Sequence, residues 1–179
     1  MEVIPTPLAG AMMIEPKVIG DGRGFFFESW NAAAFADAGL PASFVQDNHS
    51  RSLKGVLRGM HFQHPDAQGK LVRVVAGAVF DVIVDLRRSS PTFGRWHGIE
   101  LTAANQRMLW VPEGFAHGFL ALAEADLLYK CTAPYAPQHE RTLAWDDPAV
   151  GIEWPLGGEP LLSAKDATGM PLAALPVFD

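Results

Sequence analysis

The chain contains almost no cysteine and no long apolar run. Cys131 is the one cysteine among 179 residues, so no disulfide can form within the chain, as is usual for proteins of a reducing cytoplasm. No stretch approaches the roughly 18 uninterrupted apolar residues of a membrane-spanning helix. The N-terminus lacks a basic segment followed by an apolar run, so we expect no signal peptide. These absences predict a cytoplasmic protein that does not enter the membrane.

The chain also lacks an excess of positive charge. It has 14 Lys and Arg against 20 Asp and Glu, which gives a net charge of -6. Nucleic-acid binders neutralise phosphates with Lys and Arg, so we do not expect a nucleic-acid partner, although a local basic pocket for a small phosphorylated ligand is compatible with this balance. With 49% hydrophobic and 19% charged residues, residues 1–179 are predicted to form a single globular domain.

Helical patterns are scarce, and one short helix is predicted. Asn31 is a good N-cap for the alanine-rich segment that ends at Ala38, and Gly39 followed by Pro41 ends it. Elsewhere the pattern is that of strands, most clearly in Val79–Leu86, where apolar residues occupy both faces and Asp81 lies on the less apolar one.

Further short strands are separated by turn signals, which is typical of a sandwich or barrel. The tail from Trp145 onward is rich in Pro and Gly and is expected to wrap the surface. The other predicted strands are Leu71–Val75, His97–Leu101, Met108–Val111, Gly118–Leu122 and Leu127–Thr132. The sequence therefore predicts an all-β fold with peripheral arms at both ends.

Several common catalytic motifs are missing. The glycine-rich segment 20–24 is neither a dinucleotide fingerprint nor a P-loop, because no βαβ pattern surrounds it. No Gly-x-Ser-x-Gly elbow is present. Cys131 lies in an apolar strand and is interpreted as a small buried side chain.

Polar and charged residues are densest between Gln46 and Lys70. Arg58 and His61 are three residues apart, so a regular strand would place them on opposite faces, with Arg58 in solvent and His61 in the core. Gly59 between them permits a bulge that would bring both into one cavity. The segment alone does not decide between these two arrangements.

The metal-binding pattern of many cupins is half present. Pro112-x-Gly-x-x-His117 matches one half, but the His-x-His and following Glu of the other half are absent around His61 and His64. Three histidines, His61, His64 and His117, could supply ligands in principle. Without the remaining ligands we expect no metal site.

Eight blocks in order give the chain a resemblance to the dTDP-4-dehydrorhamnose 3,5-epimerase family over nearly its whole length. The blocks cover residues 21–28, 44–50, 56–63, 69–74, 111–119, 129–132, 135–137 and 162–166. Each block is a weak signal, but their joint occurrence at near-family spacing is a strong one. The resemblance implies a cupin jelly-roll β-sandwich or barrel with a short helix near the N-terminus. It also implies a cofactor-independent isomerase of dTDP-sugars in rhamnose biosynthesis.

The resemblance further implies residue roles. His61 would be the base, Asp166 its orienting carboxylate, Tyr129 the acid and Lys70 the donor near the C4 carbonyl oxygen. The substrate-binding residues would be Arg23, Glu28, Gln46, Asn48, Arg58, His117, Glu140 and Lys165. Family members commonly share an N-terminal segment across a homodimer, so Arg23 and Glu28 are expected from the partner chain. A heavily apolar surface at Trp30, Trp96 or Trp110 would support such pairing.

These residue types suit epimerisation beside a ketone. Proton removal needs a base with a pKa near neutrality, such as His, and the enolate oxygen needs a cationic donor. Return of a proton to the opposite face needs an acid, which a Tyr hydroxyl provides, and Arg can bind diphosphate oxygens. Three alternatives remain open: an epimerase that inverts C3 or C5 alone, a metal-dependent cupin enzyme, and a non-catalytic sugar-nucleotide or polysaccharide-binding cupin.

Overall fold

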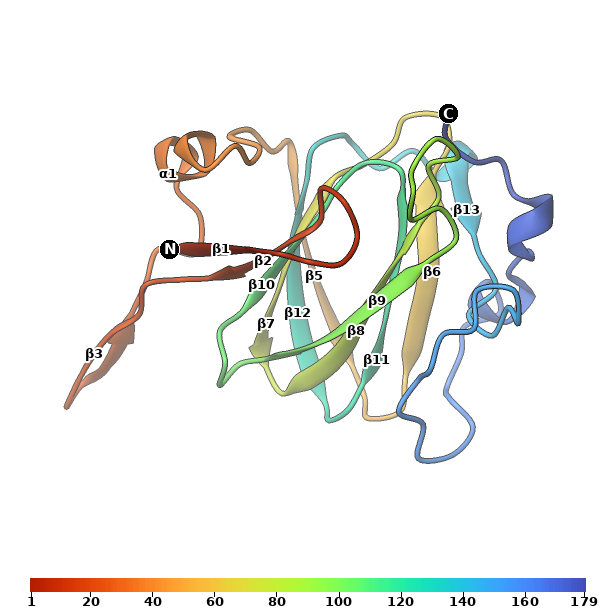
Figure 1. Cartoon of the computed structure of the whole chain (residues 1–179). Coiled ribbons are helices and arrows are strands. Elements are labelled where there is room, and N and C mark those ends of the chain that lie inside the picture. The colour runs from red at the N-terminus through yellow and green to blue at the C-terminus, as the bar shows by residue number, and fades with distance from the viewer.

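Two antiparallel sheets face each other in the computed structural model, which describes residues 1–179 (Figure 1). The six-stranded sheet has the order β1 (Glu2–Pro5), β2 (Met12–Glu15), β10 (Met108–Val111), β7 (Lys70–Ala76), β12 (Ala125–Cys131) and β5 (Gln46–Ser52). The five-stranded sheet has the order β13 (Glu140–Thr142), β6 (Leu57–Gln63), β11 (Phe115–Ala121), β8 (Ala78–Asp85) and β9 (Trp96–Thr102). The predicted all-β sandwich is confirmed, and it is an open sandwich without a closed barrel.

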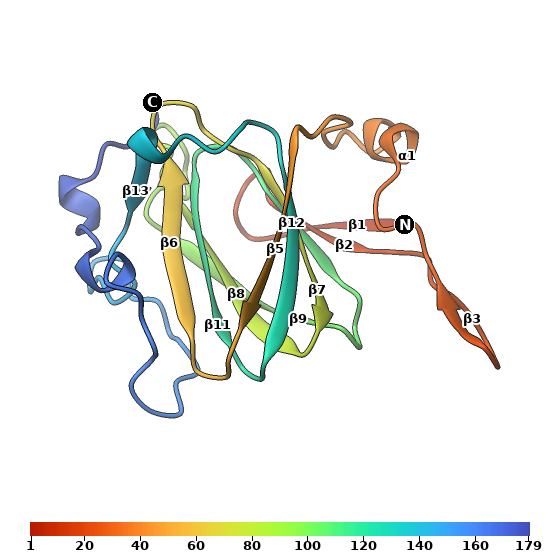
Figure 2. The same cartoon turned by 180° about the vertical axis from the view of Figure 1, so that it is seen from behind.

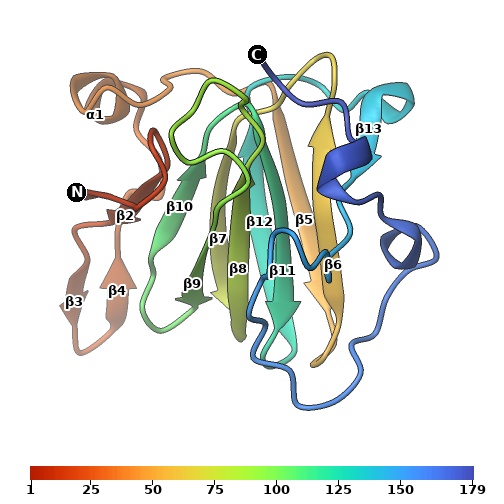
Figure 3. The same ribbon diagram turned by 45° about the vertical axis from the view of Figure 1, so that its right-hand side comes forward.

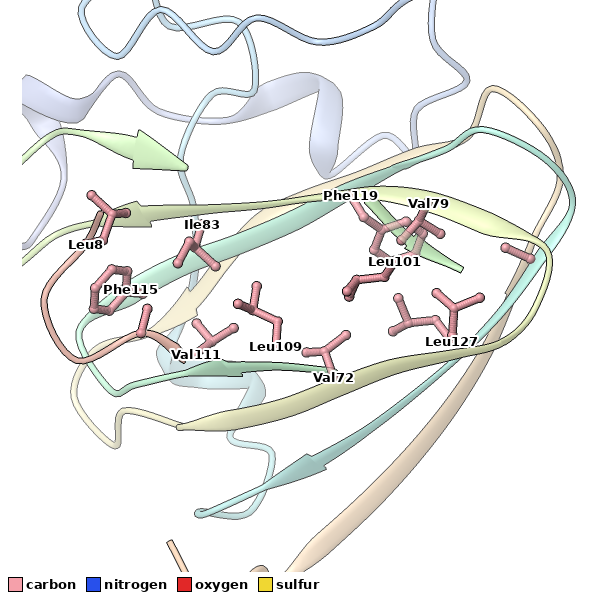
Figure 4. Packing of buried hydrophobic residues seen from close by; sticks show 13 residues of the cluster. Leu8, Val72, Val79, Ile83, Leu101, Leu109, Val111, Phe115, Phe119 and Leu127 are labelled. Atoms are coloured by element: carbon pink, nitrogen blue, oxygen red, sulfur yellow. The ribbon is translucent and has the colours of Figure 1, made fainter. Parts of the chain in front are cut away.

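The apolar half of the interior lies between the sheets, where side chains from alternate strand positions meet (Figure 4). Val79 and Ile83 of β8 face Val72, Leu109 and their neighbours across the sandwich. Such burial of apolar area contributes roughly 25 cal/mol per Å² to folding. This packed half gives the sandwich a rigid base for the polar half described below.

Other segments pack on the outer faces of the two sheets, and for the five-stranded sheet this agrees with the apolar pattern on both faces of β8. Helix α1 (Ala32–Asp37) packs Phe35 against the six-stranded sheet beside Leu71 and Trp110. The C-terminal segment, with the short helices η2 (Asp166–Thr168) and η3 (Leu172–Ala174), lies over the five-stranded sheet, where Val82 and Val84 are buried (Figures 1 and 3). The helix η1 (Pro137–His139) precedes β13.

The predicted helix is confirmed at both ends. Asn31 accepts a hydrogen bond from the Ala34 backbone N–H at 3.1 Å, and Gly39 follows the helix with a φ of +71°. No helix of the structure is long and apolar enough to cross a membrane. A two-stranded hairpin of β3 (Ile19–Asp21) and β4 (Gly24–Phe26) projects from the body of the molecule (Figures 1 and 3).

All the predicted strands exist, with ends that differ by a few residues. β11 begins at Phe115 rather than Gly118, and β12 spans Ala125–Cys131 rather than Leu127–Thr132. β5 was not predicted, because its sequence is polar throughout. It is nevertheless paired along its length with β12, at the edge of the six-stranded sheet (Figure 2). Its inward side chains face a cavity rather than the apolar core, and this explains the missing apolar alternation.

Candidate active site

A cavity of about 360 Å³ lies in the polar half of the sandwich, between β5 and β12 of one sheet and β6 and β11 of the other. Figure 2 shows these strands side by side. Nine predicted site residues line the cavity: Gln46, Asn48, Arg58, His61, Lys70, His117, Tyr129, Glu140 and Lys165. The fold therefore brings together residues that are up to 119 positions apart, from Gln46 to Lys165.

A β-bulge places Arg58 and His61 in the same cavity. His117 of β11 pairs with His61 of β6, and Phe119 pairs with Arg58. Two residues of β11 therefore span the same length as three residues of β6. The extra residue on β6 removes the alternation that would send the two side chains to opposite faces. Gly59 allows this bulge, because its φ is +123° and a Cβ there would lie 2.6 Å from the Cα of Gly118. The bulged arrangement, left open by the sequence, is the one present.

His61 and Asp166 form a closely hydrogen-bonded pair. His61 Nε2 lies 2.5 Å from Asp166 Oδ1. Ser163 donates its hydroxyl to the other carboxylate oxygen at 2.8 Å. Asp166 is buried, and although burial raises its pKa, the hydrogen bond and charge of His61 outweigh this and lower it. The carboxylate therefore stays ionised and holds the imidazole ring in a fixed orientation.

Lys70 and Tyr129 line the same cavity from the opposing sheet. Lys70 is 8% exposed, and burial lowers its pKa, offset in part by the nearby Cys131 and Glu140. Burial raises the pKa of Tyr129, so its hydroxyl keeps its proton at neutral pH. Neither side chain donates a hydrogen bond within the chain, so both polar ends are free to meet a ligand.

His117 is held by a second buried carboxylate. Its Nε2 lies 2.9 and 3.0 Å from the two oxygens of Asp81, which is fully buried. Asp81 thus lies on the interior face of β8 with Val79 and Ile83, and its hydrogen-bond partner explains how a carboxylate is buried there. His64 instead packs its ring against Phe178 at 5.0 Å and does not line the cavity. The three histidines of the metal hypothesis do not converge, and no group of three His, Cys, Asp or Glu side chains is arranged to hold a metal ion.

The more exposed rim of the cavity carries charged and aromatic side chains. Glu140 accepts hydrogen bonds from Lys165 at 2.9 Å and from the hydroxyl of Tyr135 at 3.0 Å. Burial raises the pKa of Glu140, but these two hydrogen bonds outweigh it and lower the pKa. Arg58 donates to Ser52 at 2.9 Å and is exposed. The rim therefore holds two cations, whereas the buried end holds His61 and Lys70.

Arg23 and Glu28 do not line the cavity of their own chain. Arg23 lies at the tip of the β3–β4 hairpin, 91% exposed, and pairs with Asp21. Glu28 follows this hairpin and accepts a hydrogen bond from Asn31 at 3.0 Å. Within a single chain, the two residues are separate from the other predicted site residues.

Sequence reasoning did not single out several supporting residues. Asp81 is hydrogen-bonded to His117, and Ser163 is hydrogen-bonded to Asp166. Their supporting roles become visible only from these contacts in the folded chain. Gln63 and Tyr135 lie inside the blocks that carry the family resemblance, but that resemblance assigned them no role. The same holds for Ser50, Phe62, Gly118 and Phe119, whereas Gln68 and Leu127 lie outside the blocks and complete the lining.

Comparisons with known proteins agree with this geometry. The family model described as dTDP-4-dehydrorhamnose 3,5-epimerase matches residues 5–174. The dTDP-4-dehydrorhamnose 3,5-epimerase of Pseudomonas aeruginosa is 56% identical over 180 residues, covering 99% of both chains. That of Salmonella typhimurium is 57% identical and covers 93% of both. The structure of dTDP-6-deoxy-D-glucose-3,5-epimerase from Legionella pneumophila, in complex with dTDP-4-keto-L-rhamnose, is 50% identical with a TM-score of 0.95 and covers 98% of this chain and 94% of that one.

Proposed function

We propose that the chain, which belongs to the dTDP-4-dehydrorhamnose 3,5-epimerase family, converts dTDP-4-keto-6-deoxy-D-glucose to dTDP-4-keto-L-rhamnose in rhamnose biosynthesis. The observation that carries the proposal is the His61–Asp166 pair in one cavity with Lys70 and Tyr129. The reaction is a redox-neutral isomerisation, because C3 and C5 each lose a proton and regain one on the opposite face.

His61 is the proposed base. Because Asp166 accepts a hydrogen bond at Nε2, the neutral ring carries its proton there and leaves Nδ1 to take the proton from carbon. The ionised Asp166 then stabilises the imidazolium that forms.

Lys70 is the proposed donor to the enolate oxygen at C4. Its ammonium is buried and has no anionic partner within hydrogen-bonding distance in the chain, so a developing oxyanion would meet an unsatisfied donor. One such donor in a dry site typically lowers a barrier by about 3 kcal/mol. Tyr129, protonated at neutral pH, is the proposed acid that returns a proton on the face opposite His61.

The distribution of burial suggests how the substrate lies. The sugar would occupy the buried end with His61 and Lys70, and the nucleoside diphosphate would extend toward the rim with Arg58 and Lys165. An Arg guanidinium binds phosphate oxygens with two parallel hydrogen bonds. We infer action in the cytoplasm, consistent with the one buried, unpaired cysteine.

Proton NMR of dTDP-4-keto-6-deoxy-D-glucose in D2O, with metal-free protein, tests the proposal. We expect deuterium at both C3 and C5, and no exchange with His61→Ala. Exchange at C3 or C5 alone would instead indicate a single epimerase. Exchange that requires added iron, zinc or manganese would indicate a metal-dependent enzyme. Nucleotide binding with no exchange under any condition would indicate a non-catalytic binding protein.

A homodimer that completes the cavity is part of the proposal. Trp110 is buried, and Trp30 and Trp96 are partly buried against core clusters, so the three do not form the heavily apolar surface expected for pairing. Exposed apolar side chains instead gather on the β3–β4 hairpin, where Ile19, Phe25 and Phe26 are 59%, 64% and 66% exposed. Exposed apolar clusters of this kind are typical of protein contacts. We propose that the hairpin docks on a second copy and brings Arg23 and Glu28 to its cavity.

Mixing two inactive variants tests this sharing. In a heterodimer of Arg23→Ala and His61→Ala chains, one of the two cavities would combine intact His61 with the partner's intact Arg23. Because random exchange of an equal mixture makes about half of the dimers heterodimers, we expect up to about a quarter of wild-type activity. If Arg23 served its own chain, every cavity would lack one of the two residues, and mixing would restore nothing.

A further inference from the structure

The loop that carries Tyr135 has no backbone hydrogen bonds of its own at residues 133–135. Tyr135 is 51% exposed and its ring lines the cavity. A backbone without such partners needs other groups to fix its conformation. In this loop, glutamine side chains supply them.

Gln63 makes the central contacts. Its Oε1 accepts a hydrogen bond from the backbone N–H of Ala136 at 2.9 Å. Its Nε2 donates to the carbonyl oxygens of Asp66 at 2.7 Å and Pro134 at 3.3 Å. The side chain is 3% exposed, so these polar groups would find no water if the amide were lost. One buried amide thus joins the 133–136 loop to the 63–69 loop.

Two further glutamines hold the same loop. Gln68 Nε2 donates to the carbonyl oxygen of Ala133 at 2.8 Å. Gln46 Oε1 accepts from the backbone N–H of Tyr135 at 2.8 Å. Four consecutive residues of the loop are therefore each bonded to a glutamine side chain.

The loop is hydrogen-bonded to the charged rim and makes no hydrogen bond to His61. Tyr135 donates its hydroxyl to Glu140, and Glu140 accepts a hydrogen bond from Lys165. His61, by contrast, is held by Asp166 and lies deeper, with 24% of its side chain exposed. A displacement of the loop would therefore change the rim while leaving the His61 pair in place.

We propose that Gln63 is a positioning residue, which fixes the 133–136 loop so that Tyr135 and Glu140 can hold the part of the substrate remote from the reacting carbons. The inference rests on the proposed function, in which the nucleotide lies toward the rim. Gln63 acts through the loop, and its loss affects binding of the nucleotide far more than the chemical step.

The Gln63→Met variant tests this, because it keeps the length of the side chain and removes its donors and acceptor. We expect the Kd for dTDP, measured by calorimetry, and the KM for the dTDP-sugar to rise about tenfold, with kcat within threefold of wild type. Hydrogen exchange should speed up at the amides of Tyr135 and Ala136. Gln138→Met is the matched control, because Gln138 is exposed and its side chain makes no hydrogen bond.

If the dTDP affinity and the amide exchange of Gln63→Met matched wild type, or if kcat fell as far as the affinity, the positioning role would be wrong. Gln68→Met removes one contact from the same loop at a less buried site and should raise the Kd by a smaller factor, which keeps the test decisive if Gln63→Met does not fold. Wild-type protein that neither binds dTDP nor turns over the sugar would count against the proposed function instead.

Discussion

Replacing Asp166 with Asn separates the charge of the carboxylate from its shape. The amide oxygen can still accept from His61 Nε2, and the amide nitrogen can still meet Ser163 Oγ, so we expect the fold to be retained. The variant removes the negative charge that lies 2.5 Å from the imidazole and stabilises the imidazolium. General base catalysis of this kind is worth about 10²–10⁴ in rate, or about 3–5 kcal/mol of barrier.

We therefore expect deuterium incorporation at C3 and C5 by Asp166→Asn to slow by about 10²–10⁴, with little change in dTDP affinity. The measurement is single-turnover NMR in D2O beside a thermal melt. Asp146→Asn, at an exposed position, should exchange at the wild-type rate. Exchange by Asp166→Asn within threefold of wild type, in a protein with an unchanged melt, would refute the role of the pair.

Three further predictions concern the acid, the bulge and acid stability. Tyr129→Phe should leave proton removal and exchange largely intact but block completed inversion, so product formation at the wild-type rate in a coupled reductase assay would exclude Tyr129 as the acid. Gly59→Ala should destabilise the fold by about 3 kcal/mol or more, because the φ of Gly59 is +123° and the new Cβ would clash with Gly118. Gly22→Ala is the control, because a Cβ at Gly22 meets no other atom. Free energies of unfolding of the two variants within about 1 kcal/mol of each other, from denaturant melts, would contradict the prediction. Asp85 is fully buried, and although burial raises its pKa, the hydrogen bonds from Arg87, Ser90 and Thr92 lower it below the ordinary 3.8. Its stabilisation is therefore present above about pH 4 and lost as the pH falls through its native pKa. Asp85→Asn should accordingly show a shallower loss of stability in acid melts than wild type, and equal slopes would count against this.

Secondary structure was predictable for most of the apolar central strands, but not for short strands of the N-terminal arm such as β2. The predicted span of β10, Met108–Val111, is the observed one, because every residue of that strand is buried. The single helix was predictable from Asn31 and the alanines that follow it, since capping and propensity are local properties. β5 was not predictable, because a strand whose inward face lines a polar cavity carries no apolar alternation.

The residues of the candidate site were identified from the family resemblance, all but Glu140 within its blocks, and their chemistry was recognisable by residue type. The residues that hold them in place could not be identified in this way. Asp81 and Ser163 matter because β8 and the C-terminal segment bring them to His117 and Asp166. The glutamines around residues 133–136 likewise became visible only through contacts between segments up to 89 residues apart.

Signals within the sequence were enough to predict the β-rich class, the short helix, the absence of a fingerprint for a bound dinucleotide and the residue types for proton transfer. These properties follow from local periodicity, capping and side-chain chemistry. The folded chain was needed to establish that Arg58 and His61 share a cavity, that Asp166 reaches His61 across 105 positions, and that the β3–β4 hairpin stands apart from the cavity of its own chain. The physical reason is that bulges, sheet pairing and the path of a tail depend on contacts between distant segments, which local preferences do not encode.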